Sequence, residues 1–154
     1  MIIVRAAKPS DAQVLFEWRN DASARVASSS RVEVEWEGHR AWLESLIADP
    51  RRFLYIAEST ESSGLARVGT SRFDLDPDGL EAEVSINLNP EFRGRGLAAG
   101  VLGASLERFA SVWAGALPIR ALIRPENTRS VRLFTAAGFV LSGSKGDIDI
   151  YQLG

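Results

Sequence analysis

A glycine-rich turn before a predicted helix is the first feature of this sequence that could do chemistry. Residues 93–96 read Arg-Gly-Arg-Gly, and the apolar spacing from Leu97 to Val112 predicts a helix directly after them. Such a turn gathers unpaired backbone N–H groups at the positive end of the helix dipole, which suits a phosphate. It lacks the Gly-Lys-Ser/Thr ending of a Walker loop and the third glycine of a Rossmann fingerprint. A purely structural turn is the alternative.

Two residues with proton-transfer chemistry stand apart from that turn. Glu83 lies on the polar face of residues 82–88, which alternate strictly between apolar and polar side chains. It is either a general base or a solvated strand carboxylate. His39 is the only histidine, and it shares an apolar stripe with Trp36 and Leu43, where a packed core residue is the alternative to a catalytic one. The single histidine argues against a catalytic triad or a multi-histidine metal site, and the lack of cysteine excludes thiolate chemistry.

The strands that must position these residues are predicted from apolar and alternating stretches. Seven are expected, at 2–5, 53–57, 68–75, 82–88, 119–123, 139–141 and 147–153. Turn-forming residues at 61–64 and 76–79 separate the second, third and fourth of them. This order predicts antiparallel hairpins followed by strand–helix–strand crossovers. The expected fold class is α/β (α+β), a mixed and mostly antiparallel sheet of about seven strands flanked by helices.

Helix signals fill the remaining segments. Ser10 and Gln13 are spaced as a capping box, which predicts a helix from there to about Arg19. Asn127 is placed to begin a further helix, and Gly138 to end it in the left-handed conformation. A second helix stopping near residue 50 is predicted by apolar side chains at three- and four-residue steps, namely Val32, Trp36, His39, Leu43, Leu46 and Ile47.

Composition limits the classes of partner. The 154 residues are enough for one domain spanning 1–154, and 45% apolar with 25% charged residues is typical of a globular protein. A formal charge of −2 lacks the positive excess expected of a nucleic-acid or membrane-surface binder. No apolar run approaches the roughly 18 residues that span a bilayer, and the lack of cysteine favours a cytoplasmic location. The oligomeric state stays open, with a homodimer as one option.

Two segments resemble the GCN5-related N-acetyltransferases (GNAT). Residues 93–98 resemble the family's Q/R-x-x-G-x-G/A signature, and residues 127–139, an asparagine, a short helix and then Gly-Phe, look like its later segment. The two occur in the family's order, and the resemblance covers nearly the whole chain. Residues 18–21 and 37–43 are similar to the GNAT branch that acetylates nucleotide-linked amino sugars.

The resemblance implies a sheet splayed between 82–88 and 119–123 and acetyl-CoA as co-substrate, with no metal. The pantetheine arm is expected on backbone groups near Ile86, Asn87 and Leu88. Arg19 and Asn20 are placed to touch the acceptor. The other expected cofactor contacts are Arg93, Gly94, Arg95, Gly96, Leu97, Ala98, Ala99 and Asn127.

The implied reaction is direct attack of an amine on the thioester. Glu83 is the first candidate for the base and His39 the second. Many relatives carry a tyrosine, which protonates the leaving thiolate, at the position of Phe134 in this chain. Tyr151, Ser85, a water molecule or no acid at all are the alternatives, because a CoA thiol has a pKa of about 8–9, like free cysteine.

The expected function is therefore an acetyl-CoA-dependent N-acetyltransferase acting on a small amine, with a nucleotide-linked amino sugar as the leading acceptor. A protein N-terminal acetyltransferase of the ribosomal-protein type, or another small-amine acetyltransferase, is the alternative within the enzyme class. A non-catalytic acyl-CoA-binding sensor is the alternative outside it, and Phe134 keeps that alternative open.

Overall fold

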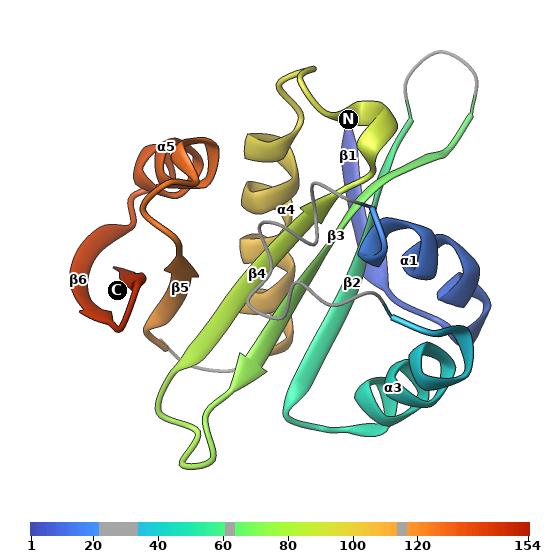
Figure 1. The fold of residues 1–154 in the computed structure, drawn as a ribbon, viewed down its shortest axis with the longest axis horizontal. Coiled ribbons are helices and arrows are strands. Elements are labelled where there is room, and N and C mark those ends of the chain that lie inside the picture. The colour runs from blue at the N-terminus through green and yellow to red at the C-terminus, as the bar shows by residue number, and fades with distance from the viewer. Residues whose placement is uncertain (22–33, 61–63, 114–116) are drawn as a thin grey trace.

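The computed structural model describes residues 1–21, 34–60, 64–113 and 117–154 (Figure 1). Its strands are β1 (Ile2–Ala6), β2 (Arg52–Ser59), β3 (Ala66–Leu75), β4 (Ala82–Leu88), β5 (Ile119–Ile123), β6 (Val140–Lys145) and β7 (Ile148–Leu153). Its helices are α1 (Ala12–Arg19), α3 (Trp36–Ala48), α4 (Ala98–Val112) and α5 (Thr128–Ala136), with 3-10 turns η1 (Pro9–Asp11) and η2 (Pro90–Phe92). The seven predicted strands are confirmed, and the sixth extends further than expected.

The strands form one mixed sheet in the order β1-β2-β3-β4-β5-β7-β6. Neighbouring strands are antiparallel except β4 and β5, which run parallel because the crossover through α4 joins them. These two strands pair only at Ala82 with Ile119 and at Glu83 with Arg120. Beyond Glu83 they diverge, as Figure 1 shows between β4 and β5. The predicted splay is confirmed.

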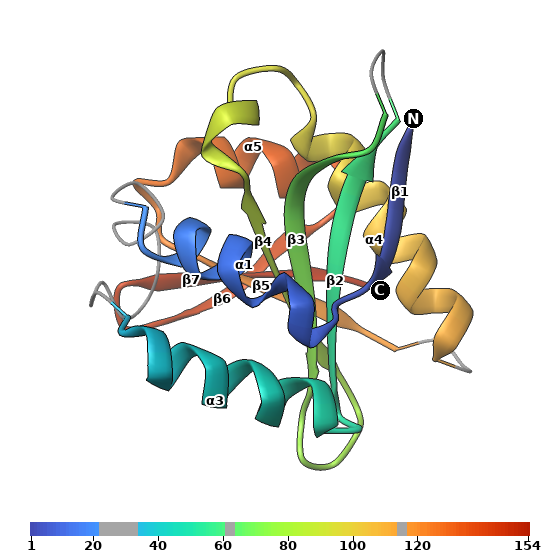
Figure 2. The ribbon, with the colours of Figure 1, turned by 90° about the vertical axis from the view of Figure 1, so that its right-hand side faces the viewer.

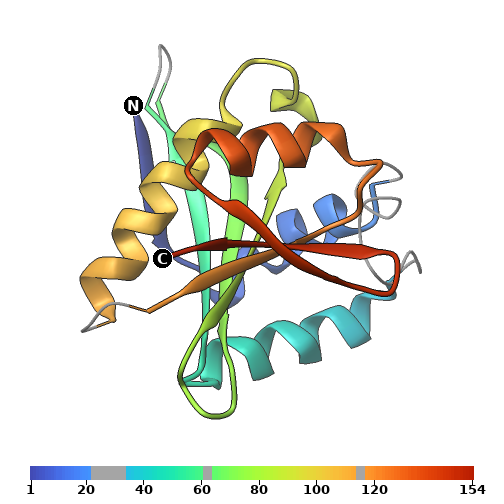
Figure 3. The same ribbon diagram turned by 90° about the vertical axis from the view of Figure 1, so that its left-hand side faces the viewer.

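Helices cover both faces of the sheet. Figure 2 shows α1 and α3 on one side of the first strands and α4 on the other, and Figure 3 shows α5 above β5 to β7. On the α4 side, Phe73 of β3 stacks on Phe109 of α4 with ring centroids 4.4 Å apart. On the α1–α3 side, the contacts with the sheet are concentrated on β2, where Leu54 and Ile56 pack against both helices.

The start of α1 differs from the prediction. Ser10 and Gln13 do not form a capping box, because the 3-10 turn η1 comes first and α1 has no side-chain cap. Instead the buried carboxylate of Asp11 accepts two hydrogen bonds from Arg5 of β1, at 2.9 Å each, and one from the Lys8 N–H at 2.8 Å. Burial raises the pKa of Asp11, but these bonds and the Arg5 charge outweigh it, and the net pKa lies below its ordinary value.

The second predicted helix is α3, and the middle of the predicted apolar stripe is confirmed, whereas Trp36 is only half-buried and Ile47 is exposed. Its buried residues are His39, Leu43 and Leu46. Val32 of that stripe lies outside the described residues, as do positions 61–63 of the predicted turn.

The predicted limits of α5 are confirmed. Asn127 is its N-cap, and the side-chain oxygen accepts the Ser130 N–H at 3.3 Å. Gly138 follows the helix with φ +100°, a backbone conformation that glycine adopts without strain.

Candidate active site

The glycine turn lies directly before α4. Gly94 and Gly96 have φ values of +76° and +72°, where residues with side chains are strained. A Cβ atom built on either glycine would meet nothing within 4 Å, so the space in front of the turn is open on the protein side. Leu97, the N-cap of α4, supplies no side-chain hydrogen bond. The N–H groups of the first helical turn, including those of Ala98 and Ala99, have no carbonyl partner within the helix, and no N-cap side chain replaces it.

β4 leads from the start of the splay to this turn. Its ladder with β3 runs from Ala82 to Leu88, whereas its ladder with β5 ends at Glu83. The β5-facing edge near Ile86 and Asn87 is therefore not paired with a strand. An unpaired edge of N–H and C=O groups suits an extended ligand that carries amides of its own.

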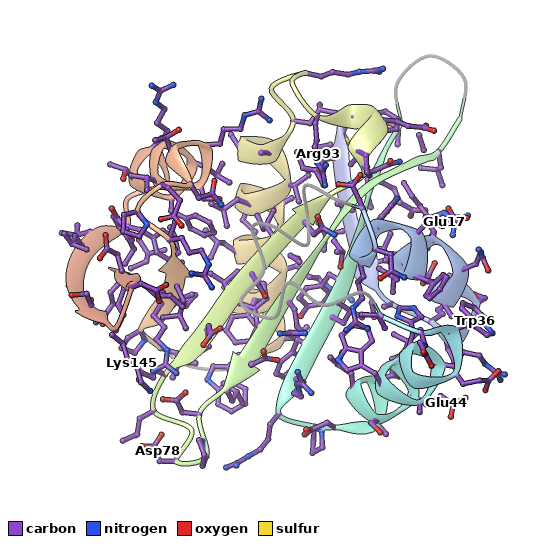
Figure 4. All side chains as sticks on the ribbon, viewed as in Figure 1. Glu17, Trp36, Glu44, Asp78, Arg93 and Lys145 are labelled. Atoms are coloured by element: carbon purple, nitrogen blue, oxygen red, sulfur yellow. The ribbon has the colours of Figure 1, made fainter. Side chains whose placement is uncertain are left out.

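The two arginines of the turn have different surroundings. Arg93 Nη1 donates to Asp21 Oδ2 at 2.7 Å and Nη2 donates to the Leu88 carbonyl at 3.3 Å. Figure 4 shows Arg93 beside the end of β4 and the start of α4. The Arg95 side chain is exposed, with Cζ 5.0 Å from the ring centroid of Phe92. Arg93 therefore ties the turn to the chain just after α1, and Arg95 is the arginine whose charge stays exposed.

Glu83 stands where the splay begins, in the last residue pair of β4 and β5. It lies opposite Asp74 of β3, and its Oε1 is 3.8 Å from Nη2 of Arg120. The carboxylate is 30% exposed. Burial raises the pKa of Glu83, the Arg120 charge opposes this rise, and the Asp74 charge adds to it. A carboxylate with a raised pKa is a stronger base once deprotonated.

Ion pairs that the sequence reasoning missed surround Glu83. They are Arg52–Asp74 and Arg72–Asp74 at 3.0 Å, Arg120–Asp76 at 2.9 Å, and Arg120–Glu81. Alternation along residues 66–75 places Arg72 and Asp74 on one face of the strand, and this pattern could have predicted their ion pair from the sequence. Their partners on β2 and β5 depend on strand order, which no local pattern contains.

His39 is completely buried and is held at both ring nitrogens. Nε2 lies 2.8 Å from the Ala12 carbonyl, which can only accept, so Nε2 carries the proton and Nδ1 accepts from Arg19 Nη1 at 3.0 Å. The rings of Trp36 and Trp42 stack on the imidazole. Burial lowers the pKa of His39, the bond to Ala12 opposes this, and the Arg19 charge lowers it further. This geometry favours the strand carboxylate over His39 as a base.

The two predicted acceptor residues differ in what their side chains already bind. Asn20 Nδ2 donates to the Val34 carbonyl and Oδ1 accepts the Val34 N–H, both at 2.7 Å. Arg19 stacks its guanidinium over Trp42, with Cζ 3.9 Å from the ring centroid, and binds His39 through Nη1. Arg19 keeps donors without a partner among the described residues, whereas the Asn20 amide holds the segment before α3.

Phe134 is a core residue at the position where many relatives carry a tyrosine. It is 5% exposed, and its ring packs edge-on against Phe139 with centroids 5.0 Å apart. Tyr151 is also buried, on β7, opposite Ala121 of β5 and Leu141 of β6. The identity of the acid, if the reaction uses one, stays a prediction.

The described residues contain neither a candidate metal centre nor a candidate membrane span. No group of three or more metal-binding side chains there is arranged to hold an ion. None of the helices described has both the length and the apolar character needed to cross a bilayer.

Comparison with known proteins identifies the family. Residues 1–140 match the family model described as an acetyltransferase (GNAT) domain. Among curated proteins no sequence matches significantly. A domain from Methanocaldococcus jannaschii has a similar structure, with a TM-score of 0.85 and 21% identity over 99% of this chain and 97% of that chain.

Two enzymes of known activity have similar structures. Spermidine N-acetyltransferase from Vibrio cholerae, in complex with CoA and spermine, has a TM-score of 0.82 and 17% identity over 98% of this chain and 92% of that chain. An aminoglycoside acetyltransferase in complex with coenzyme A has a TM-score of 0.80 and 20% identity over 99% of this chain and 93% of that chain. These likenesses show a shared fold. Because the family model covers most of the residues, the chain belongs to the acetyltransferase (GNAT) domain family.

Proposed function

We propose that this acetyltransferase transfers the acetyl group of acetyl-CoA to the primary amine of a nucleotide-linked amino sugar. The observation that carries the proposal is the course of β4, which pairs with β5 as far as Glu83 and then leads through η2 to the glycine turn before α4. A pyrophosphate on the turn, with pantetheine along the unpaired edge, would direct the thioester toward the point where the two strands meet. The amine would then react beside Glu83.

The ammonium nitrogen must lose two protons on the way to the amide, and the first must leave before the nitrogen can attack. Glu83 removes a proton from the ammonium form of the acceptor, and the amine nitrogen then attacks the thioester carbonyl carbon. The C–S bond breaks and the electron pair leaves with the CoA sulfur. The nitrogen loses its second proton to that thiolate or to water, so that the neutral amide and CoA form. Since the thiol has a pKa of about 8–9, the thiolate can leave without an acid at modest cost.

The acceptor class is supported by the N-terminal half. The segments 18–21 and 37–43, similar to amino-sugar acetyltransferases, meet where Arg19 of α1 contacts His39 and Trp42 of α3. The neighbours that acetylate spermidine and aminoglycosides also act on small amines, which supports a small primary amine as the acceptor.

A panel of acceptors tests the proposal. Release of CoA from acetyl-CoA is measured with UDP-linked amino sugars, peptides with free N-termini and polyamines, and the acetylated product is identified by mass spectrometry. The highest kcat/KM is expected for a UDP-linked amino sugar. Preference for the peptides would identify an N-terminal acetyltransferase. Tight acetyl-CoA binding without turnover of any amine would identify a sensor and reject the catalytic proposal.

A further inference from the structure

Arg19, the last residue of α1, is a half-buried cation whose contacts carry no negative charge. Nη1 donates to His39 Nδ1 at 3.0 Å, and the guanidinium plane lies 3.9 Å over the Trp42 ring. A guanidinium can only donate, so His39 Nδ1 accepts from Arg19 and carries no proton, and with Nε2 donating to the Ala12 carbonyl the imidazole is neutral. Among the described residues no carboxylate pairs with Arg19, and Nε and Nη2 have no hydrogen-bond partner.

The other arginines on this face of the sheet are all paired. Arg52 and Arg72 share Asp74, and Arg120 contacts three carboxylates. Arg72 is close enough that its charge, after burial, also lowers the pKa of Arg19. Taking a cation out of water beside another cation is unfavourable unless an anion joins it. The other arginines thus have carboxylate partners, whereas among the described residues no carboxylate lies against Arg19.

The Arg19 side chain is also held in place. His39 lies between the rings of Trp36 and Trp42, at centroid distances of 5.9 and 5.5 Å, and Phe16 contacts its ring at 5.4 Å. An imidazole fixed in this way orients the Arg19 guanidinium through Nη1 and leaves its Nε and Nη2 donors available to a ligand. A fork fixed before binding loses less conformational entropy when it pairs with a carboxylate or phosphate.

We propose that Arg19 is an anion receptor in the acceptor site, so that the preferred acceptor carries a phosphate or carboxylate in addition to its amine. His39 is then a positioning residue that orients Arg19, and not the base. This inference rests on the proposed acetyl transfer and assigns a residue to the anionic part of the acceptor. A polyamine offers this guanidinium no partner, whereas the diphosphate of a nucleotide-linked sugar does.

The test compares glucosamine-based acceptors that carry or lack an anionic group. Glucosamine 1-phosphate, a glucosamine derivative with a carboxylate in its aglycone, and methyl glucosaminide are assayed with the wild type and with Arg19→Gln and Arg19→Lys. The wild type should favour one of the two anionic acceptors over the neutral one by at least about tenfold in kcat/KM, and the favoured acceptor identifies the anion as phosphate or carboxylate. Arg19→Gln should remove most of this preference by raising KM, and Arg19→Lys should retain part of it. The control is Arg51→Gln, which removes an exposed charge between α3 and β2 and should keep the full preference.

His39→Gln separates positioning from catalysis. A glutamine can donate to the Ala12 carbonyl and accept from Arg19, so the preference for the anionic acceptor should largely survive with an unchanged pH profile. His39→Leu, if folded by circular dichroism, should lose the preference. Equal use of neutral and anionic acceptors by the wild type would overturn the inference and leave the acetyltransferase proposal standing. If acetyl-CoA binds but no amine is acetylated, the proposed function fails and the inference fails with it.

Discussion

Glu83 shows how neighbouring groups set the chemistry of one residue. Its carboxylate is only 30% exposed, and burial raises its pKa above the ordinary glutamate value. As a base it works only when deprotonated, so kcat/KM should fall as the pH drops through this raised pKa. The acid limb of the pH profile is therefore expected above the range of a solvated glutamate.

The substitution Glu83→Gln tests this role. It keeps the size and hydrogen bonding of the side chain but removes its basicity, so kcat/KM should fall by about 10²–10⁴ while acetyl-CoA affinity is preserved. Raising the pH should recover part of the loss, because more of the acceptor amine is then already neutral. Steady-state kinetics across pH and calorimetry with acetyl-CoA measure both effects.

Two comparisons make that result interpretable. Glu44→Gln removes an exposed carboxylate of α3 and should leave kcat/KM unchanged. A larger loss in folded His39→Gln than in Glu83→Gln would make the histidine the base. If neither costs as much as tenfold, the site works by positioning an amine that is already neutral.

Phe134 and Tyr151 decide whether an acid is needed. Phe134 packs against Phe139 in the core, so Phe134→Tyr should not raise kcat by much and should lower the unfolding temperature. Tyr151→Phe should retain most of the activity. A loss of about a hundredfold or more in Tyr151→Phe, with the fold intact, would assign the acid to the last strand.

Among the elements, the glycine turn before α4 offers the sharpest test of cofactor binding. Gly96→Ala adds a methyl group to open space, so it should obstruct a bound pyrophosphate and weaken acetyl-CoA binding at least about tenfold. Part of any effect comes from strain at φ +72°, and Gly79→Ala is the matched control because Gly79 has φ +71° and equally open surroundings in the β3–β4 turn.

Calorimetric titration and thermal unfolding of both variants separate the two causes. Similar losses of stability with a loss of affinity only in Gly96→Ala would support the pyrophosphate position. Unchanged acetyl-CoA affinity in Gly96→Ala would contradict the placement of the pyrophosphate on this turn.

Local patterns in the sequence predicted the elements well and their partners poorly. The alternation of residues 82–88 identified β4, because one of its faces is core and the other polar. The capping box at Ser10 failed, because Asp11 binds Arg5 of a preceding strand and shifts the helix start. A local spacing rule contains no information on such tertiary contacts.

The site itself was predictable only in part. The glycine turn and Glu83 follow from the pattern of a single segment each, whereas the pairing of Arg19 with His39 joins two helices and appears only in the structure. The same holds for Arg93, whose charge the sequence suggests for the phosphate and whose guanidinium binds Asp21.

On the scale of the whole molecule, the sheet consists of two parts that are connected by a short strand pairing between β4 and β5. Within the described residues, strands β1 to β4 share two residue pairs with β5 to β7, and α4 lies in the crossover between β4 and β5. A ligand in the splay would contact both parts. By mass action, acetyl-CoA at a hundred times its Kd should stabilise the fold by about 2.7 kcal/mol.

Hydrogen exchange locates that stabilisation. With acetyl-CoA bound, amides of residues 84–88 and of β5 should exchange more slowly, while those of β1 should change least. Protection spread evenly over all strands, or absent from residues 84–88, would contradict the placement of the ligand in the splay.

The contact between Arg93 and Asp21 has a thermodynamic consequence. One guanidinium joins the cofactor turn and the Leu88 carbonyl to the chain that follows Arg19. If bound acetyl-CoA fixes the conformation of the turn, the contact between Arg93 and Asp21 also fixes the chain at the end of α1. Each substrate then raises the affinity of the protein for the other by the same factor. In the wild type, acetyl-CoA should bind more tightly when a non-reacting hydroxyl analogue of the acceptor is present, and Arg93→Gln should bring that ratio of Kd values close to one. An unchanged ratio in the variant would mean that the two half-sites bind their substrates independently.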